Sequence, residues 1–204
     1  MTDVVHDAPL GPPGLAAPPR REFQIVPVAG LPIVGVILVA LVVAIAVNKL
    51  WALEFFHVAF GGLWTGVDLF LGFIVGPIMG RMTIAARVEF STRLMPKMVL
   101  LMPTLVTVTL VAGWQLASQL GYTSTDYINH DWLVASYIVV GVMAVVALGV
   151  LEPANIAVLY ELRKPAPDGE LIARLMKRFI YTAGITGTMQ VATLVIMTKI
   201  GSGG

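Results

Sequence analysis

The chain has 204 residues, of which 57% are hydrophobic and 12% are charged, and its mean hydropathy is +0.87. A soluble domain of this length does not need so much apolar content for its core, so the composition predicts an integral membrane protein. A net charge of +1 argues against a nucleic-acid partner. Without cysteine the chain has no disulfide, no thiolate metal site and no covalently attached c-type haem.

The first 22 residues are rich in Pro, Gly and Ala and show no apolar period. This composition predicts a disordered tail over residues 1–22, followed by a single transmembrane domain over residues 23–204. The tail also lacks the order of basic, apolar and small residues that is typical of a signal peptide, and we expect none.

Five apolar stretches follow the tail, and each has the roughly 20 residues that a spanning helix needs. They lie near residues 25–47, 50–79, 98–120, 132–160 and 178–198. The predicted fold is therefore an all-α bundle of about five transmembrane helices in contact with the lipid bilayer.

The positions of the basic residues predict the orientation of this bundle. All 13 Lys and Arg residues except Lys49 and Lys199 fall on one side of a five-span arrangement. Because basic loops stay in the cytoplasm, we expect a cytoplasmic amino terminus and an exoplasmic carboxy terminus in a bacterial inner membrane.

The second apolar stretch carries polar side chains on one helical face. At about 100° per residue, Glu54, Trp64 and Asp68 all fall within roughly 60° of His57. Ionisable groups inside a bilayer are costly unless they meet a partner or a wet cavity, so this stripe is the first candidate site.

Depth divides the stripe into an upper and a lower part. At roughly 1.5 Å per residue, His57 lies about 10 Å below the exoplasmic surface, with Glu54 above it, and His130 begins the fourth stretch on the same side. Asp68 lies past the middle, and Glu152 is deeper still. The upper residues suit a cofactor or metal, whereas Asp68 and Glu152 suit a proton path.

Three roles are open for His57. It could ligate a b-type haem, with His130 as the second ligand, Glu54 orienting the imidazole or accepting a proton, and Trp64 stacked on the macrocycle. It could hold copper or another metal together with Glu54 and with His130 or Asp131. It could also hydrogen-bond a carbonyl or Glu54 and fix the helix register, and Trp64 would then only fill the core. Copper is the weaker cofactor candidate, because the methionines between residues 79 and 102 cluster near the cytoplasmic ends of spans.

Several strings resemble one known group. The string LEFFHVAFGGLWTGVDLFLGFIVGPIMGRM, followed by MPKMVLLMPTLVTVTLVAGWQL, HDWLVASYIVV and GITGTMQVATLVIMTKI, is similar to helices of the CopD-like membrane proteins. Their relatives include the HemJ-type protoporphyrinogen oxidases and the membrane domain of cytochrome-linked urate oxidases. The resemblance implies that His57 matches a histidine associated with haem in some members. Where the HemJ-type pattern has a histidine and a lysine shortly after a tryptophan, Trp132 is followed by LVAS, which argues against that oxidase activity.

We therefore expect a small b-haem-binding or redox-associated membrane subunit that is not an enzyme by itself and that serves a redox partner or a larger membrane complex. One alternative is transport of copper or protons along Glu54, His57 and Asp68. Another is a non-catalytic assembly or anchoring subunit, in which the stripe contacts helices of other chains.

Overall fold

A computed structural model describes residues 25–202 of the chain, so the predicted tail at residues 1–22 lies outside the described residues. Within the described part, five helical rods are long and apolar enough to cross a membrane. They span Val28–Val47, Leu50–Arg81, Ile84–Gln119, His130–Leu162 and Gly169–Gly201. The prediction of an all-helical bundle with five such helices is confirmed.

Some rods consist of several segments. The elements in chain order are η1 (Val28–Gly30), α1 (Leu31–Val47), α2 (Leu50–Leu69), η2 (Phe70–Val75), α3 (Gly76–Arg81), α4 (Ile84–Gln119), α5 (His130–Val146), η3 (Ala147–Leu151), α6 (Glu152–Leu162) and α7 (Gly169–Gly201). The helices α4 and α7 begin well before the apolar stretches predicted at 98 and 178. Each starts with a charged amphipathic segment that extends the helix beyond its apolar part.

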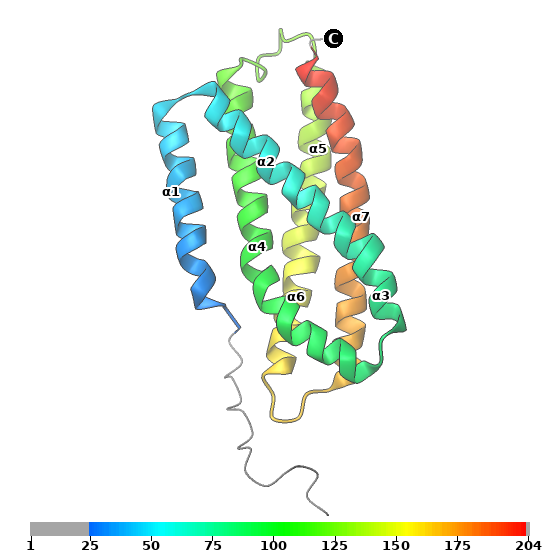
Figure 1. Cartoon of the computed structure of the whole chain (residues 1–204). Coiled ribbons are helices and arrows are strands. Elements are labelled where there is room, and N and C mark those ends of the chain that lie inside the picture. The colour runs from blue at the N-terminus through cyan, green and yellow to red at the C-terminus, as the bar shows by residue number, and fades with distance from the viewer. Residues whose placement is uncertain (1–24, 203–204) are drawn as a thin grey trace, which may run out of the picture.

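The rod of α2 and α3 crosses the bundle obliquely, over α4 and α7 (Figure 1). The α1–α2 turn, the α4–α5 loop and the end of α7 share what we call the upper end; the α3–α4 and α6–α7 connections share the lower end. Helix α1 lies at the edge and buries only Leu41 and Ala44, so most of its surface remains apolar and exposed.

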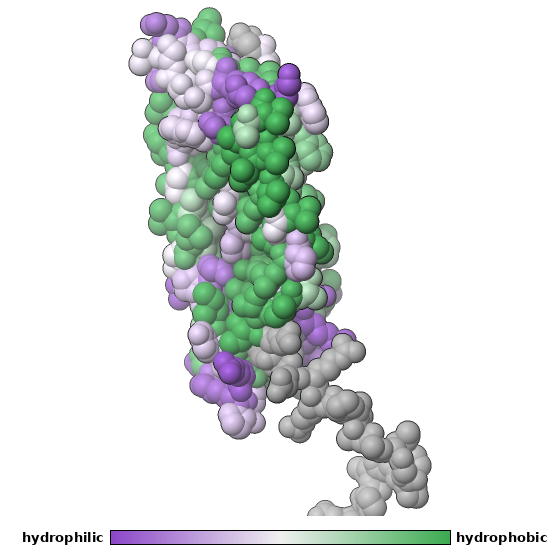
Figure 2. Space-filling view, turned by 90° about the vertical axis from the view of Figure 1, so that its left-hand side faces the viewer, coloured by the Kyte–Doolittle hydropathy of each residue, from purple (hydrophilic) through white to green (hydrophobic). Residues whose placement is uncertain are grey.

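The bundle surface has an apolar middle and polar ends. In the face shown in Figure 2, hydrophobic residues cover the middle, and hydrophilic residues gather at the upper and lower ends. Large apolar side chains point outward along the rods, for example Ile33, Phe73 and Val195, each about two-thirds exposed. Such a surface suits a lipid environment, because water would solvate it poorly.

Two helical rods contain a wide turn just before a proline. The π-helical segments η2 and η3 come directly before Gly76-Pro77 and Glu152-Pro153. Proline lacks an N–H donor, and its ring clashes with the carbonyl one turn back, so a wider turn accommodates it without breaking the rod.

Glycines bring the α2–η2 rod against α7. A Cβ built on Gly72 would lie 2.3 Å from the Gly184 Cα, and one on Gly187 would lie 3.0 Å from the Leu69 backbone nitrogen. Ala183 and Gly187 form a small-residue pair that is typical of close helix contacts, and the tightest point of the contact lies at Gly72 and Gly184. This contact presses the Asp68 side of α2 onto α7.

Candidate functional site

A cavity of about 550 Å³ lies in the upper half of the bundle among α2, α4, α5 and α7. It reaches the upper end near Leu50, Tyr122 and Gly201, and most of its walls are apolar. Ligand pockets in proteins usually enclose about 300 to 1,000 Å³ and combine apolar walls with a few polar groups. The cavity therefore has the size and the lining of a ligand site.

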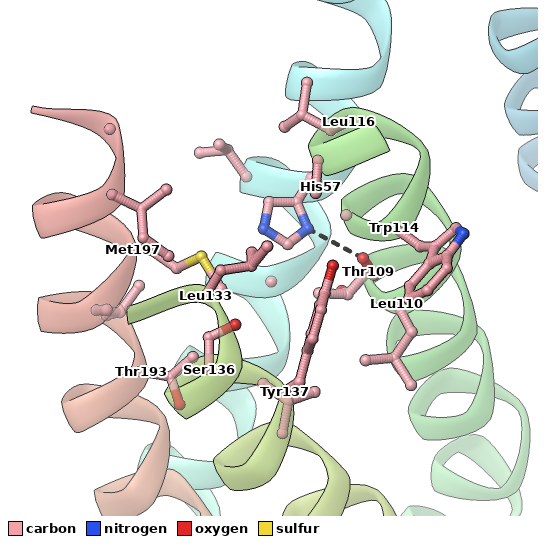
Figure 3. A pocket seen from close by; sticks show the side chains of 18 of the residues that line it. His57, Thr109, Leu110, Trp114, Leu116, Leu133, Ser136, Tyr137, Thr193 and Met197 are labelled. Carbon is pink, nitrogen blue, oxygen red and sulfur yellow. Dashed lines mark hydrogen bonds between the residues drawn. The ribbon is translucent and has the colours of Figure 1, made fainter. Parts of the chain in front are cut away.

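His57 projects from α2 into this cavity and is half-buried. Its Nδ1 lies 3.0 Å from the backbone oxygen of Thr109 on α4. A carbonyl oxygen can only accept, so Nδ1 carries the proton and donates it. In the neutral ring Nε2 then keeps its lone pair. Figure 3 shows this second nitrogen pointing away from α4, toward the space bordered by Leu133 and Met197.

Gly113, one turn beyond Thr109 on α4, makes room for the imidazole. A Cβ at this position would lie 2.6 Å from both Cε1 and Nδ1 of His57. Thr109 and Gly113 therefore set the orientation of the ring together, although sequence reasoning did not single out either residue. The only local signal is a lone glycine inside a long apolar helix, which marks a close approach without showing what approaches.

The other upper members of the stripe line the same cavity. Glu54 is exposed near the mouth, Gly61 lies one turn below His57, and Trp64 is 3% exposed in the wall. The indole nitrogen of Trp64 is buried and has no hydrogen-bond partner among the described residues. The structure thus brings Glu54, His57 and Trp64 into one cavity, as their shared helical face predicts.

Asp68 lies just beyond this cavity and is fully buried. Its Oδ2 accepts hydrogen bonds from Thr186 Oγ1 at 3.1 Å and from Gln190 Nε2 at 3.2 Å, both on α7. Thr186 Oγ1 also lies 2.9 Å from the Ala183 carbonyl, and its single proton can serve only one acceptor fully. No basic side chain pairs with Asp68 within residues 25–202.

Gln190 connects Asp68 to the cavity, because it both donates to the carboxylate and lines the cavity wall. Trp64 Nε1, Asp68 Oδ1 and Gln190 Oε1 are all buried without a hydrogen-bond partner in the described structure. The Trp64 N–H lies near the Asp68 carboxyl and can become its donor. Gln190 Oε1 remains free to accept a hydrogen bond from a polar group in the cavity.

The structure does not place the remaining predicted site residues in the cavity wall. His130 is the first residue of α5, and its Nδ1 is buried without a partner in the described part of the chain. Glu152 borders a separate small cavity of about 20 Å³ together with Met102 and Phe179. Within residues 25–202, no three His, Asp or Glu side chains gather as a metal site would require.

Two methionines outside the group at residues 79–102 line the cavity, and the sequence alone assigns them no role. Met143 of α5 and Met197 of α7 both line it, and Thr193 Oγ1 lies 3.8 Å from the Met143 sulfur. Met197 lies seven residues after Gln190 on the same face of α7, and Figure 3 shows its sulfur at the cavity beside Leu133. A thioether is a soft ligand that suits iron or copper.

Comparisons of the chain with protein-family models, with curated proteins and with solved structures found no match. The resemblance to the CopD-like group therefore stays a prediction.

The site itself offers three chemical groups. The first is the imidazole of His57, whose Nε2 in the neutral ring directs its lone pair into an apolar cavity. The second is the thioether of Met197 on the cavity wall, and the third is the buried carboxyl of Asp68, reached through Gln190. The imidazole can ligate a metal or accept a proton, and the carboxyl can take up a proton nearby.

Proposed function

We propose that the protein is a b-haem-binding subunit of the bacterial inner membrane that passes electrons between a redox partner and a larger membrane complex. It is not an enzyme by itself in this proposal. The observation that carries it is the Nε2 lone pair of His57, held by the Thr109 carbonyl and directed into a cavity of about 550 Å³.

The chemistry of the lining supports haem over a bare metal ion. A histidine that donates its other N–H to a carbonyl has a fixed tautomer and a more basic ligating nitrogen. The apolar walls suit a large flat ring, which Trp64 would contact. Met197 is the candidate second ligand in the cavity lining, in place of the His130 that the sequence predicts. When bound, haem b supplies one-electron redox chemistry.

The membrane placement is part of the proposal. The apolar middle of the bundle and the polar ends support insertion (Figure 2). Most of the basic side chains in the described part belong to segments at the lower end, which would face the cytoplasm by the positive-inside rule. The upper mouth of the cavity would then face the exoplasmic side.

Asp68 supports a second candidate function, proton transfer or transport. A buried carboxyl without a basic partner, linked to the cavity through Gln190, is suited to take up and release a proton. Copper transport has less support, because the described residues form no metal cluster. Glu152 has no observed connection to Asp68 and is not included in this path.

The absorbance spectrum tests the haem proposal. The full-length protein, produced with added haem precursor and purified in detergent, should show Soret and α bands in the reduced-minus-oxidised spectrum, with about one haem per chain. A folded preparation saturated with haem but without these bands would contradict it. In that case, a proton flux in liposomes that Asp68→Asn abolishes would favour the transport function.

A further inference from the structure

A second cavity, of about 210 Å³, lies at the lower end, far from His57 along the bundle. It is formed where α3 and the start of α4 meet the first half of α7. Its lining includes Met79, Gly80, Arg87, Lys177, Ile180 and Tyr181. The haem proposal uses none of these residues.

Two basic side chains from different helices meet in this cavity. Arg87 of α4 donates from Nη2 to the Gly80 carbonyl at 3.1 Å, which holds its guanidinium across the gap to α3. Its Nε is buried and has no partner among the described residues, so one N–H donor remains unused. Lys177 of α7 adds a second positive charge.

No carboxylate in the described structure neutralises these charges. The cavity lining contains no acidic residue. The ion pairs found within residues 25–202 join Arg93 to Glu89 and Lys164 to Glu161, and neither involves Arg87 or Lys177. Two positive charges without a counter-charge and one unused N–H donor around the same cavity favour the binding of an anion there.

The apolar side of the cavity indicates what kind of anion fits. Tyr181 is 65% exposed on the flank of the bundle, and Lys177 Nζ lies 5.7 Å from the centre of its ring. Ile180 and Met79 complete the apolar wall. A tyrosine beside basic residues at the end of an apolar belt is typical of the membrane interface, where lipid headgroups lie.

We propose that this cavity binds the headgroup phosphate of an anionic phospholipid. Arg87 would donate hydrogen bonds to the phosphate and Lys177 would contribute charge, while the acyl chains follow the apolar flank from Tyr181 toward the middle of the bundle. Basic pockets between helices on the cytoplasmic side are suited to such headgroups. The inference rests on the proposed membrane placement but not on haem binding.

Lipid retention tests the inference with the full-length protein in a zwitterionic detergent. Phosphatidylglycerol should be retained in native mass spectra and should raise the melting temperature, whereas phosphatidylcholine and inorganic phosphate at equal concentration should not. The double variant Arg87→Gln/Lys177→Gln should bind phosphatidylglycerol about thirtyfold more weakly, because about two charge contacts are lost.

The matched control is Arg93→Gln/Lys199→Gln, which removes the same number of charges from exposed positions outside the cavity. It should retain phosphatidylglycerol like the wild type. If the double variant misfolds, Arg87→Lys serves instead, because it keeps the charge but loses the guanidinium donors and should weaken binding. Equal retention of phosphatidylglycerol by the wild type and by the Arg87 and Lys177 variants would overturn the proposal. The same holds if phosphatidylcholine or free phosphate raises the melting temperature as much as phosphatidylglycerol does. An unchanged haem spectrum in the Arg87 and Lys177 variants would show that lipid binding does not depend on haem binding.

Discussion

His57 on α2 donates its Nδ1–H to the backbone oxygen of Thr109 on α4 over 3.0 Å. Because the acceptor is a backbone carbonyl, no substitution of the Thr109 side chain removes it. The bond links the two helices that flank one wall of the cavity and fixes which nitrogen of the imidazole faces inward. The space that Gly113 leaves open is therefore the most direct means of perturbing the ring without replacing it.

Gly113→Ala should displace the His57 ring, because the added methyl would lie 2.6 Å from two of its atoms. We expect a loss of haem per chain of about tenfold or more, since a small misplacement of a ligating group strongly weakens its bond. Haem content by absorbance and folding by circular dichroism measure the effect. Gly141→Ala on α5, where a methyl meets nothing within 4 Å, is the matched control. Normal haem content in Gly113→Ala would contradict the assigned ligand geometry.

Gly72→Ala should destabilise the bundle, because its methyl would lie 2.3 Å from the Gly184 backbone, which cannot move aside as a side chain can. Overpacking of this kind usually costs about 1 to 3 kcal/mol. We expect a lower melting temperature in detergent by several degrees. Gly66→Ala on α2, which meets nothing within 4 Å, should melt like the wild type or slightly higher. Equal melting of the Gly72 and Gly66 variants would refute the tight contact between the α2–η2 rod and α7.

Asp68→Asn should keep the shape of the buried site but remove its exchangeable proton. Reduction of the cavity occupant adds negative charge, which favours proton uptake at Asp68, so the wild-type midpoint potential should fall as pH rises. The slope should not exceed about 59 mV per pH unit for one proton and one electron. Spectroelectrochemical titration should find a flat profile in Asp68→Asn and the wild-type slope in Glu152→Gln. If Asp68→Asn retains the full slope, Asp68 is not the proton acceptor.

Asp168→Ala should weaken the start of α7. The Asp168 Oδ1 accepts hydrogen bonds from the backbone nitrogens of Glu170 at 2.9 Å and Leu171 at 3.0 Å, which caps the helix. Loss of such a cap costs about 1 kcal/mol. Unfolding in denaturant should show this decrease, whereas Asp126→Ala in the exposed α4–α5 loop should not. A decrease of similar size in both variants would mean that capping is not the cause.

The sequence predicts the five rods and the polar stripe well, because both depend only on local pattern. About twenty apolar residues form a spanning helix whatever its neighbours are, and spacings of three and seven place Glu54, His57 and Trp64 on one face. All three do line one cavity.

The partners of that stripe could not be derived in the same way. Which residues of α4 and α7 face His57 and Asp68 depends on how each helix is rotated about its axis and where it crosses α2. Only the structure therefore identifies these partners, which are Thr109, Gly113, Gln190 and Met197. The predicted pairing of His57 with His130 rests on similar depth alone, and depth does not specify which side of a helix faces inward.

The central claim is that His57 Nε2 ligates haem, and the reduced-minus-oxidised spectrum of His57→Gly tests it most directly. The variant, purified with haem supplied as for the wild type, should lack the wild-type Soret and α bands. Added imidazole should restore them, because it can occupy the vacated space and supply the same nitrogen. Wild-type bands in His57→Gly without imidazole would contradict the assignment.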